Sequence, residues 1–196
     1  MSTVTRTRRL TGTAMLAAVS VVLSFLAFPV PLMPSFIKLD FAELPALIAS
    51  FAYGPISGIA VCLVKNLISL LKTSSNGIGT LCNFLLGVSF VAPAGIIYLK
   101  NRTRIGALIG SLVGAAVMAV LSIFFNYYIV YPMYTAFMPM EAIMGMYQAI
   151  NSRVQTLWQA LIWFNAPFTF VKGLFSVVIT FIVYKPLSPI LKGARK

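Results

Sequence analysis

Residues 10–37, LTGTAMLAAVSVVLSFLAFPVPLMPSFI, form a stretch of twenty-eight residues without a charged side chain. Comparable uncharged stretches follow at 44–64, 73–99, 105–140 and 154–171. An apolar helix needs roughly 20 residues to cross the hydrocarbon core of a bilayer, so these stretches supply five or six crossings. The apolar runs are continuous rather than alternating with a period of two, which argues against a transmembrane β-barrel. The pattern predicts an all-α integral membrane protein.

The composition agrees with a membrane location. Apolar residues make up 60% of the 196-residue chain and charged residues only 9%, and the mean hydropathy is +0.95. This composition leaves too little polar surface to cover a water-soluble globule. The two cysteines, Cys62 and Cys82, lie in apolar stretches, and we interpret them as core residues rather than as a disulfide or a metal site.

Proline and glycine residues divide the apolar stretches into six predicted transmembrane helices. Three prolines between positions 29 and 34 interrupt the first stretch, and Tyr53-Gly54-Pro55 interrupts the second. Asp40 and Glu43 have the spacing of an N-cap residue and its N3 partner, so we interpret them as the cap of the second helix. We expect a single membrane domain over 1–196, with helices at about 10–28, 41–53, 55–72, 79–99, 105–131 and 158–184 and outer loops at 29–40, 73–78 and 132–156, the last with room for a short interfacial helix.

The basic residues predict the orientation in the membrane. Six crossings place both termini on one side together with ten basic residues, against three on the other. Because Lys and Arg are enriched on the cytoplasmic side, we expect a multi-pass protein of the bacterial cell membrane with both termini in the cytoplasm. The same distribution explains the formal net charge of +12 and argues against nucleic-acid binding. The expected cytoplasmic residues are Arg6, Arg8, Arg9, Lys100, Arg102, Arg104, Lys185, Lys192, Arg195 and Lys196, and the expected outer ones are Lys38, Lys72 and Arg153.

The inventory of reactive side chains argues against an enzyme. The chain contains no histidine, which removes serine–histidine triads and imidazole proton relays. Its only carboxylate side chains are Asp40, Glu43 and Glu141. No GxxxxGK[ST] loop is present to hold nucleotide phosphates. We therefore expect no catalytic residue, no metal site and no cofactor.

Polar side chains inside the predicted spans indicate a binding site. A lysine at the centre of a span costs about 2.5–3.5 kcal/mol to insert, so it must face a cavity, a partner or a ligand. Lys172 lies about fourteen residues into the last predicted helix, too deep to extend to an interface, and we interpret it as functional. Lys65 has a structural alternative, because it could pair with a carboxylate or reach an interface. The amides in the spans, which could bond either a ligand or a neighbouring helix, are Asn66, Asn83, Asn126 and Asn165.

Aromatic residues cluster near the outer ends of the last two predicted helices. They are consistent with an interfacial aromatic belt. They would also suit the wall of a pocket for a planar heteroaromatic ligand such as a flavin. Both interpretations stay open for Phe124, Phe125, Tyr127, Tyr128, Tyr131, Tyr134, Trp158, Trp163, Phe164, Phe168 and Phe170.

Several short segments follow one another in a distinctive order. A proline-containing loop leads into KLDFAELP at 38–45, followed by YGP at 53–55, VKNL at 64–67, NFLLG at 83–87, FNYY at 125–128 and PFTFVKG at 167–173. In this order they resemble the substrate-binding S components of energy-coupling factor (ECF) vitamin transporters, and among these the riboflavin-specific branch. The resemblance covers nearly the whole chain.

The resemblance implies six helices around a vitamin pocket near the outer face, closed by the loop between the first two helices. The family places an Asn and, three residues later, a Lys of helix six against the flavin. Here the Lys is Lys172 and the other position is Thr169, whose hydroxyl keeps a hydrogen-bonding group. Asn83 is a further candidate, for the ribityl hydroxyls. The expected ligand-binding residues are Leu39, Asp40, Asn83, Asn126, Thr169 and Lys172.

Small residues indicate where the chain docks. Ala14 and Ala18 form a small-xxx-small pair, which lets helices approach closely, and the resemblance makes them the docking site for the transmembrane T component. Gly106, Gly110 and Gly114 form a competing surface, which we interpret as packing within the bundle.

The resemblance implies riboflavin (vitamin B2) uptake, energised by the T component and two ATP-binding subunits. In this family the loaded S component tips in the membrane to release its vitamin inside. Two alternatives stay open. One is an S component for another vitamin or flavin analogue, such as flavin mononucleotide, thiamine, biotin or a precursor. The other is a small membrane enzyme or assembly factor.

Overall fold

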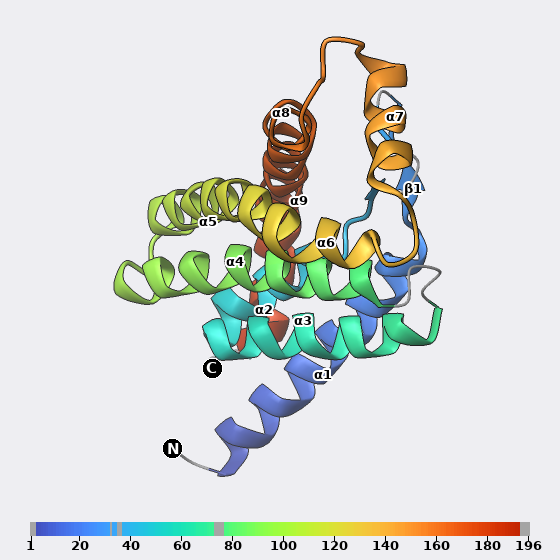
Figure 1. Ribbon diagram of the computed structural model, residues 1–196. Helices are drawn as coiled ribbons and strands as arrows, with labels where there is room; N and C mark the ends of the chain where they lie inside the picture. Colours follow the sequence, from blue (N-terminus) through green and yellow to red (C-terminus); the bar gives the residue numbers. More distant parts are fainter. Residues whose placement is uncertain (1–2, 32, 35–36, 73–76, 193–196) are drawn as a thin grey trace.

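Apolar helices dominate the computed structural model of this chain, which describes residues 3–31, 33–34, 37–72 and 77–192 (Figure 1). Four helical segments of the described chain are long and apolar enough to cross a membrane: Arg6–Phe25, Ile78–Lys100, Arg104–Tyr134 and Leu157–Ile182. The elements in chain order are α1 (Thr3–Phe25), β1 (Phe28–Pro29), β2 (Lys38–Leu39), α2 (Glu43–Tyr53), α3 (Pro55–Ser69), the 3₁₀ turn η1 (Leu70–Lys72), α4 (Ile78–Lys100), α5 (Arg104–Phe125), the π turn η2 (Asn126–Val130), α6 (Tyr131–Tyr134), α7 (Met140–Ile150), α8 (Leu157–Ala160), the π turn η3 (Leu161–Asn165) and α9 (Ala166–Lys192).

The expected count of six transmembrane helices is matched only loosely, because the four long segments are accompanied by α2 and α3, which are too short to cross a hydrocarbon core of roughly 30 Å. At 1.5 Å per residue, the 11 residues of α2 and the 15 of α3 extend about 16 and 22 Å. Their junction is Gly54, whose φ of 100° few residues other than glycine adopt, followed by Pro55 in the first turn of α3. Helix α2 contacts α1, α3, α4 and α9 and is buried from Glu43 to Phe51. It therefore lies at the centre of the bundle.

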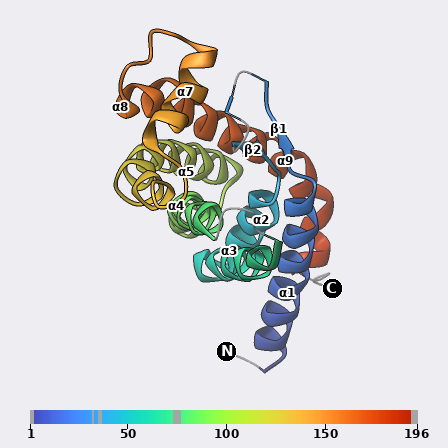
Figure 2. The ribbon, with the colours of Figure 1, turned by 45° about the vertical axis from the view of Figure 1, so that its right-hand side comes forward.

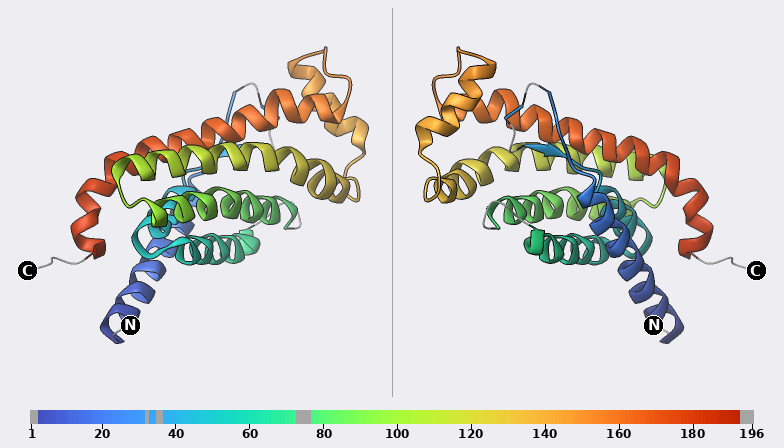
Figure 3. Two further views of the ribbon diagram at one scale, coloured as in Figure 1. Left: turned by 90° about the vertical axis from the view of Figure 1, so that its left-hand side faces the viewer. Right: turned by 90° about the vertical axis from the view of Figure 1, so that its right-hand side faces the viewer.

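The long helices run side by side in a stack. Helix α4 packs between α3 and α5, and α5 packs on α9, an order that Figure 3 shows from two sides. Helix α1 crosses this stack, and its N-terminal turns extend beyond it (Figure 3). The C-terminal end of α9 lies towards the same end of the molecule, whereas α7 lies at the opposite end (Figure 3). The hairpin of β1 and β2 lies on the same side of the bundle as α7 (Figure 2).

Glycines on α5 explain how closely α4 and α5 approach. A Cβ atom added to Gly110 would lie 2.7 Å from the backbone oxygen of Ala94, and one added to Gly114 would meet the backbone oxygen of Phe90. Both neighbours belong to α4. The interpretation of these glycines as bundle packing is therefore confirmed.

Two helical segments pass a proline by way of a π turn, where the sequence predicted an end or a simple helix. The expected end at Tyr131 is wrong, because α5 passes through η2 into α6 and ends at Tyr134. In η2 the N–H of Tyr131 donates to the carbonyl of Asn126, five residues earlier, and Pro132 follows. In η3 the N–H of Ala166 donates to Leu161, and Pro167 follows. The wider π turn shifts the backbone hydrogen bonds just before a residue that has no N–H to donate.

The expected loops contain local structure of their own. In the 29–40 segment, β1 and β2 pair antiparallel, with Phe28 opposite Leu39 and Pro29 opposite Lys38. The 132–156 segment contains α7. Most of the expected 73–78 turn lies outside the described residues, and α4 begins after Gly77. The last helix continues to Lys192, beyond the expected end at 184.

The close contact of α4 and α5 predicts the effect of a single methyl group. Gly110→Ala places its Cβ against the Ala94 carbonyl and should destabilise the protein by about 1–3 kcal/mol through overpacking. The matched control is Gly145→Ala on α7, where an added Cβ meets nothing within 4 Å. The control should be neutral or slightly stabilising, because alanine is the better helix former. Thermal unfolding in detergent measures both, and equal melting temperatures for the two variants would contradict this packing.

Candidate functional site

Four charged side chains meet inside the bundle and form what we call the charge cluster: Asp40, Glu43, Lys65 and Lys172. The Lys65 ammonium lies 3.0 Å from Glu43 Oε1. The Lys172 ammonium lies 3.1 Å from Glu43 Oε2 and 3.2 Å from Asp40 Oδ2. The cluster joins the segment after β2 to α2, α3 and α9. Two positive and two negative charges balance within it.

The charge cluster corrects the predicted helix cap. Helix α2 begins at Glu43, and its N-cap residue Ala42 makes no side-chain cap. Asp40 Oδ1 instead accepts a hydrogen bond from the N–H of Ala42 at 2.9 Å, which orders the turn before the helix. The i, i+3 spacing of Asp40 and Glu43 therefore aims two carboxylates at lysines far away in the sequence.

All four residues of the cluster are removed from solvent. Their exposed fractions are 8% for Asp40, 2% for Glu43, 3% for Lys65 and 8% for Lys172. Burial raises the pKa of the Asp40 carboxyl above its ordinary value, because desolvation of the charged form outweighs the attraction of the Lys172 ammonium. Removing either partner of such a buried pair strands an uncompensated charge, at a cost of about 3–5 kcal/mol.

Two more of the expected ligand-binding residues, Leu39 and Thr169, stand within three residues of a member of this cluster in the chain. Thr169 is buried on α9, three residues before Lys172 and therefore on the same helix face. Leu39 is half-buried in β2, directly before Asp40. The structure thus brings Asp40 and Lys172 into contact and places Leu39 and Thr169 close to them along the chain.

Asn126 and Asn83 have different surroundings. Asn126 is buried at the start of η2, donates to the carbonyl of Ser122 at 2.7 Å and accepts from the thiol of Cys82 at 3.9 Å. Asn83 is exposed on α4. The residue of α4 that contacts the predicted site is thus Cys82, which the sequence indicated only as a core residue.

A second polar cluster holds α7 against the bundle. The hydroxyls of Tyr131 and Tyr147 are hydrogen-bonded to each other, and Tyr147 also donates to Asn165 Oδ1 at 2.7 Å. The amide of Asn165 in turn donates to Tyr131 at 3.4 Å. Burial raises the pKa of the Tyr147 phenol well above its ordinary value, so this hydroxyl stays protonated and able to donate. Both π turns contribute to polar sites, Asn126 from η2 and Asn165 from η3.

The outer aromatic residues differ in their exposure to solvent. Trp158, Trp163 and Tyr128 are 41%, 47% and 67% exposed, as an interfacial belt requires. Trp158 packs edge-on against Tyr127 at the surface. Tyr131 is 1% exposed and belongs to the interior.

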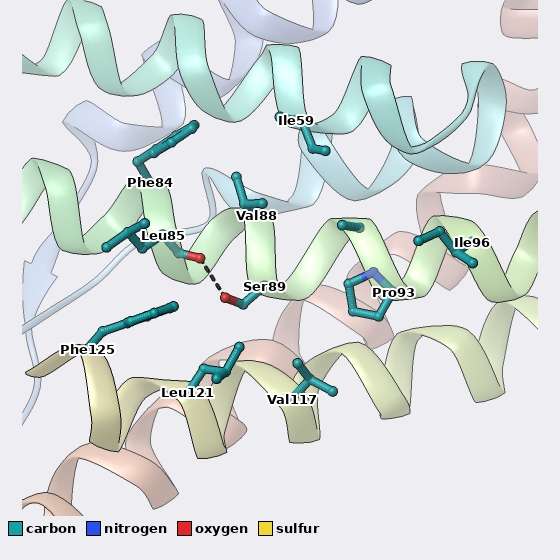
Figure 4. Close-up of a pocket in the computed structure, with 11 residues that line it drawn as sticks. Ile59, Phe84, Leu85, Val88, Ser89, Pro93, Ile96, Val117, Leu121 and Phe125 are labelled. Atoms are coloured by element: carbon teal, nitrogen blue, oxygen red, sulfur yellow. Dashed lines mark hydrogen bonds between the residues drawn. The ribbon is translucent and has the colours of Figure 1, made fainter.

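An open apolar groove lies on another face of the bundle (Figure 4). It has a volume of about 480 Å³ and is bounded by α3, α4 and α5. Phe84, Val88, Leu121 and Phe125 line it, and the lining contains none of the expected ligand-binding residues. A surface of this kind suits acyl chains rather than a ligand that needs hydrogen bonds.

The alanine pair on α1 is accessible. Ala14 and Ala18 are both exposed, whereas Leu16 and Ala17 are buried against the bundle. The small residues therefore lie on the outward face of α1, where another helix could approach closely.

Sequence reasoning missed Glu43 and Lys65 as members of the site. Their signal was present, because each is a charged residue at the edge of an apolar stretch. Glu43 had a local explanation as a cap. Lys65 was expected to pair with a carboxylate or to reach an interface, and its ion pair with Glu43 confirms the first of these alternatives. Only the packing of α2 on α3 shows that they pair with each other.

Comparison with known proteins gives one consistent result. The family described as "ECF transporter, substrate-specific component" matches residues 8–184. The chain is 32% identical over 185 residues to the riboflavin transporter RibU of Staphylococcus aureus, covering 94% of this chain and 93% of that one. It is 31% identical over 193 residues to the riboflavin transporter FmnP of Bacillus subtilis, covering 97% of each. A solved S component of a bacterial ECF transporter matches with a TM-score of 0.76 at 32% identity, covering 95% of this chain and 99% of that one.

The second polar cluster predicts how α7 is held. Tyr147→Phe removes the hydroxyl shared by Tyr131 and Asn165 and should cost about 1–3 kcal/mol, because a buried amide loses its partner. Tyr128→Phe is the control, since Tyr128 is 67% exposed and its change should be nearly neutral. Thermal unfolding compares the two, and hydrogen exchange should show faster exchange in α7 of the Tyr147 variant alone. Unchanged exchange there would rule out this anchor.

Proposed function

Because the chain belongs to the family of substrate-specific (S) components of ECF transporters, we propose that it binds riboflavin and mediates its uptake with an ATP-driven ECF module. The family consists of transporters rather than enzymes. Two relatives at 31–32% identity over nearly the whole chain are riboflavin transporters, which supports the choice of ligand.

The contact between Lys172 and Asp40 is the observation that carries this proposal. It sets a hydrogen-bond donor and an acceptor side by side, 3.2 Å apart, in a buried part of a membrane protein. The imide edge of the isoalloxazine ring has carbonyl acceptors beside an N–H donor and is complementary to such a pair. Thr169 and Asn126 would add hydroxyl and amide contacts, and Leu39 would cover the ring from the hairpin.

The balance of charge in the cluster favours a neutral ligand. Riboflavin carries no net charge, whereas flavin mononucleotide is anionic and thiamine cationic. The two lysines and two carboxylates already balance one another, so a charge on the ligand would stay uncompensated in a poorly hydrated site. Riboflavin therefore fits this cluster better than either charged vitamin.

In this proposal, partner subunits that bind ATP supply the energy for uptake. Family membership supports a T component and two ATP-binding subunits, and the exposed Ala14 and Ala18 on α1 offer a close-packing surface for the T component. The excess of basic residues at the termini and at 100–104 supports a cytoplasmic location for both termini.

Ligand titration tests the site. Riboflavin, flavin mononucleotide and thiamine are titrated into the detergent-purified protein, and binding is followed by flavin fluorescence or by equilibrium dialysis. Lys172→Met should lower riboflavin affinity about 10–100-fold, as expected for losing a hydrogen bond from a charged donor. Lys100→Met, a change to an exposed lysine at the end of α4, should leave binding as it is in the unsubstituted protein. Tighter binding of flavin mononucleotide or thiamine than of riboflavin would replace the ligand and leave the family unchanged.

Larger side chains at positions 14 and 18 of α1 test the proposed docking surface. Ala14→Leu and Ala18→Leu should abolish co-purification with the T component and vitamin uptake, because the added side chains block close helix approach. Riboflavin affinity of the isolated protein should stay unchanged. Ala116→Leu on the exposed face of α5 makes the same change elsewhere and serves as the control. Normal assembly of the α1 variants would remove these alanines from the docking surface.

A further inference from the structure

The charge cluster divides into a helical part and a hairpin part. Lys65, Glu43 and Lys172 stand on α3, α2 and α9, and α2 packs directly on both other helices. Asp40 stands outside the helices, between β2 and α2. Three of the four charges therefore belong to the packed bundle, and the fourth belongs to the connection from the hairpin.

Glu43 divides its carboxylate between the two lysines. Its Oε1 accepts a hydrogen bond from Lys65 at 3.0 Å. Its Oε2 lies 3.1 Å from the Lys172 ammonium as an ion pair, and no aligned hydrogen bond reaches this buried oxygen from the described residues. The aligned bond of Lys172 goes to Asp40 instead, at 3.2 Å. Glu43 thus attracts Lys172 by charge, while the ammonium, which has three N–H donors, can turn another of them towards a ligand acceptor.

Lys65 supplies the second positive charge that balances the two carboxylates of the cluster. Without it, Lys172 would face two carboxylates, and the cluster would carry one uncompensated negative charge in a desolvated site. With it, Glu43 is neutralised through its other carboxylate oxygen. A lysine side chain has a flexible stem of four carbons, so a fixed countercharge on a neighbouring helix restricts where its ammonium can lie.

We infer that the Glu43–Lys65 ion pair is a positioning device for Lys172, acting on the ligand only through the Lys172 ammonium. This inference rests on the proposed function, because it assigns Lys172 the contact with the flavin. Asp40 is the exchangeable partner, whose bond to Lys172 the ligand carbonyl can replace or share. Glu43 and Lys65 are then positioning residues that make no contact with the ligand.

A double-mutant cycle on riboflavin affinity tests this role. Glu43→Gln combined with Lys65→Gln removes the pair without changing the net charge, which avoids the stranded charge of either single variant. Equilibrium dialysis with radiolabelled riboflavin should show about tenfold weaker binding, within the range of couplings measured between contacting residues. The same double change in a Lys172→Met background should alter affinity by less than about twofold, because the residue that it positions is gone.

Thr169→Val supplies the matched control for the cycle. Thr169 lies on the same helix face as Lys172, but it carries no charge and takes no part in the ion pairs of Glu43. The effect of Thr169→Val on riboflavin affinity should therefore add to that of the double change. An equal loss of affinity in the Lys172→Met background and in the background that keeps Lys172 would show a merely structural role and overturn the inference. Full affinity of the double variant would overturn it too.

Thermal unfolding of the ligand-free variants tests the positioning role independently of which ligand the protein binds. If the unsubstituted protein binds no riboflavin, the proposed ligand is wrong. The cycle is then read by thermal unfolding, where the double change and Lys172→Met should be strongly non-additive because Glu43 and Lys172 are in contact. Additive changes in melting temperature would overturn the positioning role whatever the ligand is.

Discussion

Two ammonium groups inside a membrane protein require two carboxylates within reach, and the arrangement of this bundle depends on that requirement. An unpaired charge in such surroundings costs about 3–5 kcal/mol, more than most single substitutions cost. This requirement is satisfied because Lys65 pairs with Glu43 and Lys172 pairs with Asp40. Because these residues stand on α3, α9, the start of α2 and the end of the hairpin, pairing them fixes how those four parts of the chain lie together.

The same cluster points to function because it is a poor device for stability alone. Apolar residues of similar volume in place of a buried ion-pair network often leave a protein equally stable or more so. The proposed function accounts for the four buried charges by a ligand that needs a donor and an acceptor away from water. Of the two π turns, η2 supplies Asn126 to the expected site, whereas η3 supplies Asn165 to the polar cluster that holds α7.

Much of the site was visible in the sequence, and the exceptions share a cause. Lys172 was identifiable because its depth in an apolar span leaves it no route to water. Asp40 and Glu43 were misread as a helix cap, because an i, i+3 pair before an apolar run has a local explanation that needs no partner. The lysines that bond Glu43 and Asp40 stand 22 and 132 residues away in the chain, and no local pattern reports such contacts. The prolines misled in a similar way, because Pro132 predicts an end that η2 allows the helix to pass.

Hydropathy and composition were enough to identify a helical membrane protein, to locate most of its spans and to show that the chain has no histidine for acid–base catalysis. These properties are set residue by residue along the chain, so they need no knowledge of the fold. The order of short segments also indicated the family. The pairing of each carboxylate with its lysine, the contact of Cys82 rather than Asn83 with Asn126, and the anchoring of α7 by Tyr147 emerged only from the folded chain. Those contacts depend on how helices that are distant in the sequence pack. Side chains interact over only a few ångströms, so which of them meet is decided only when the backbone has folded.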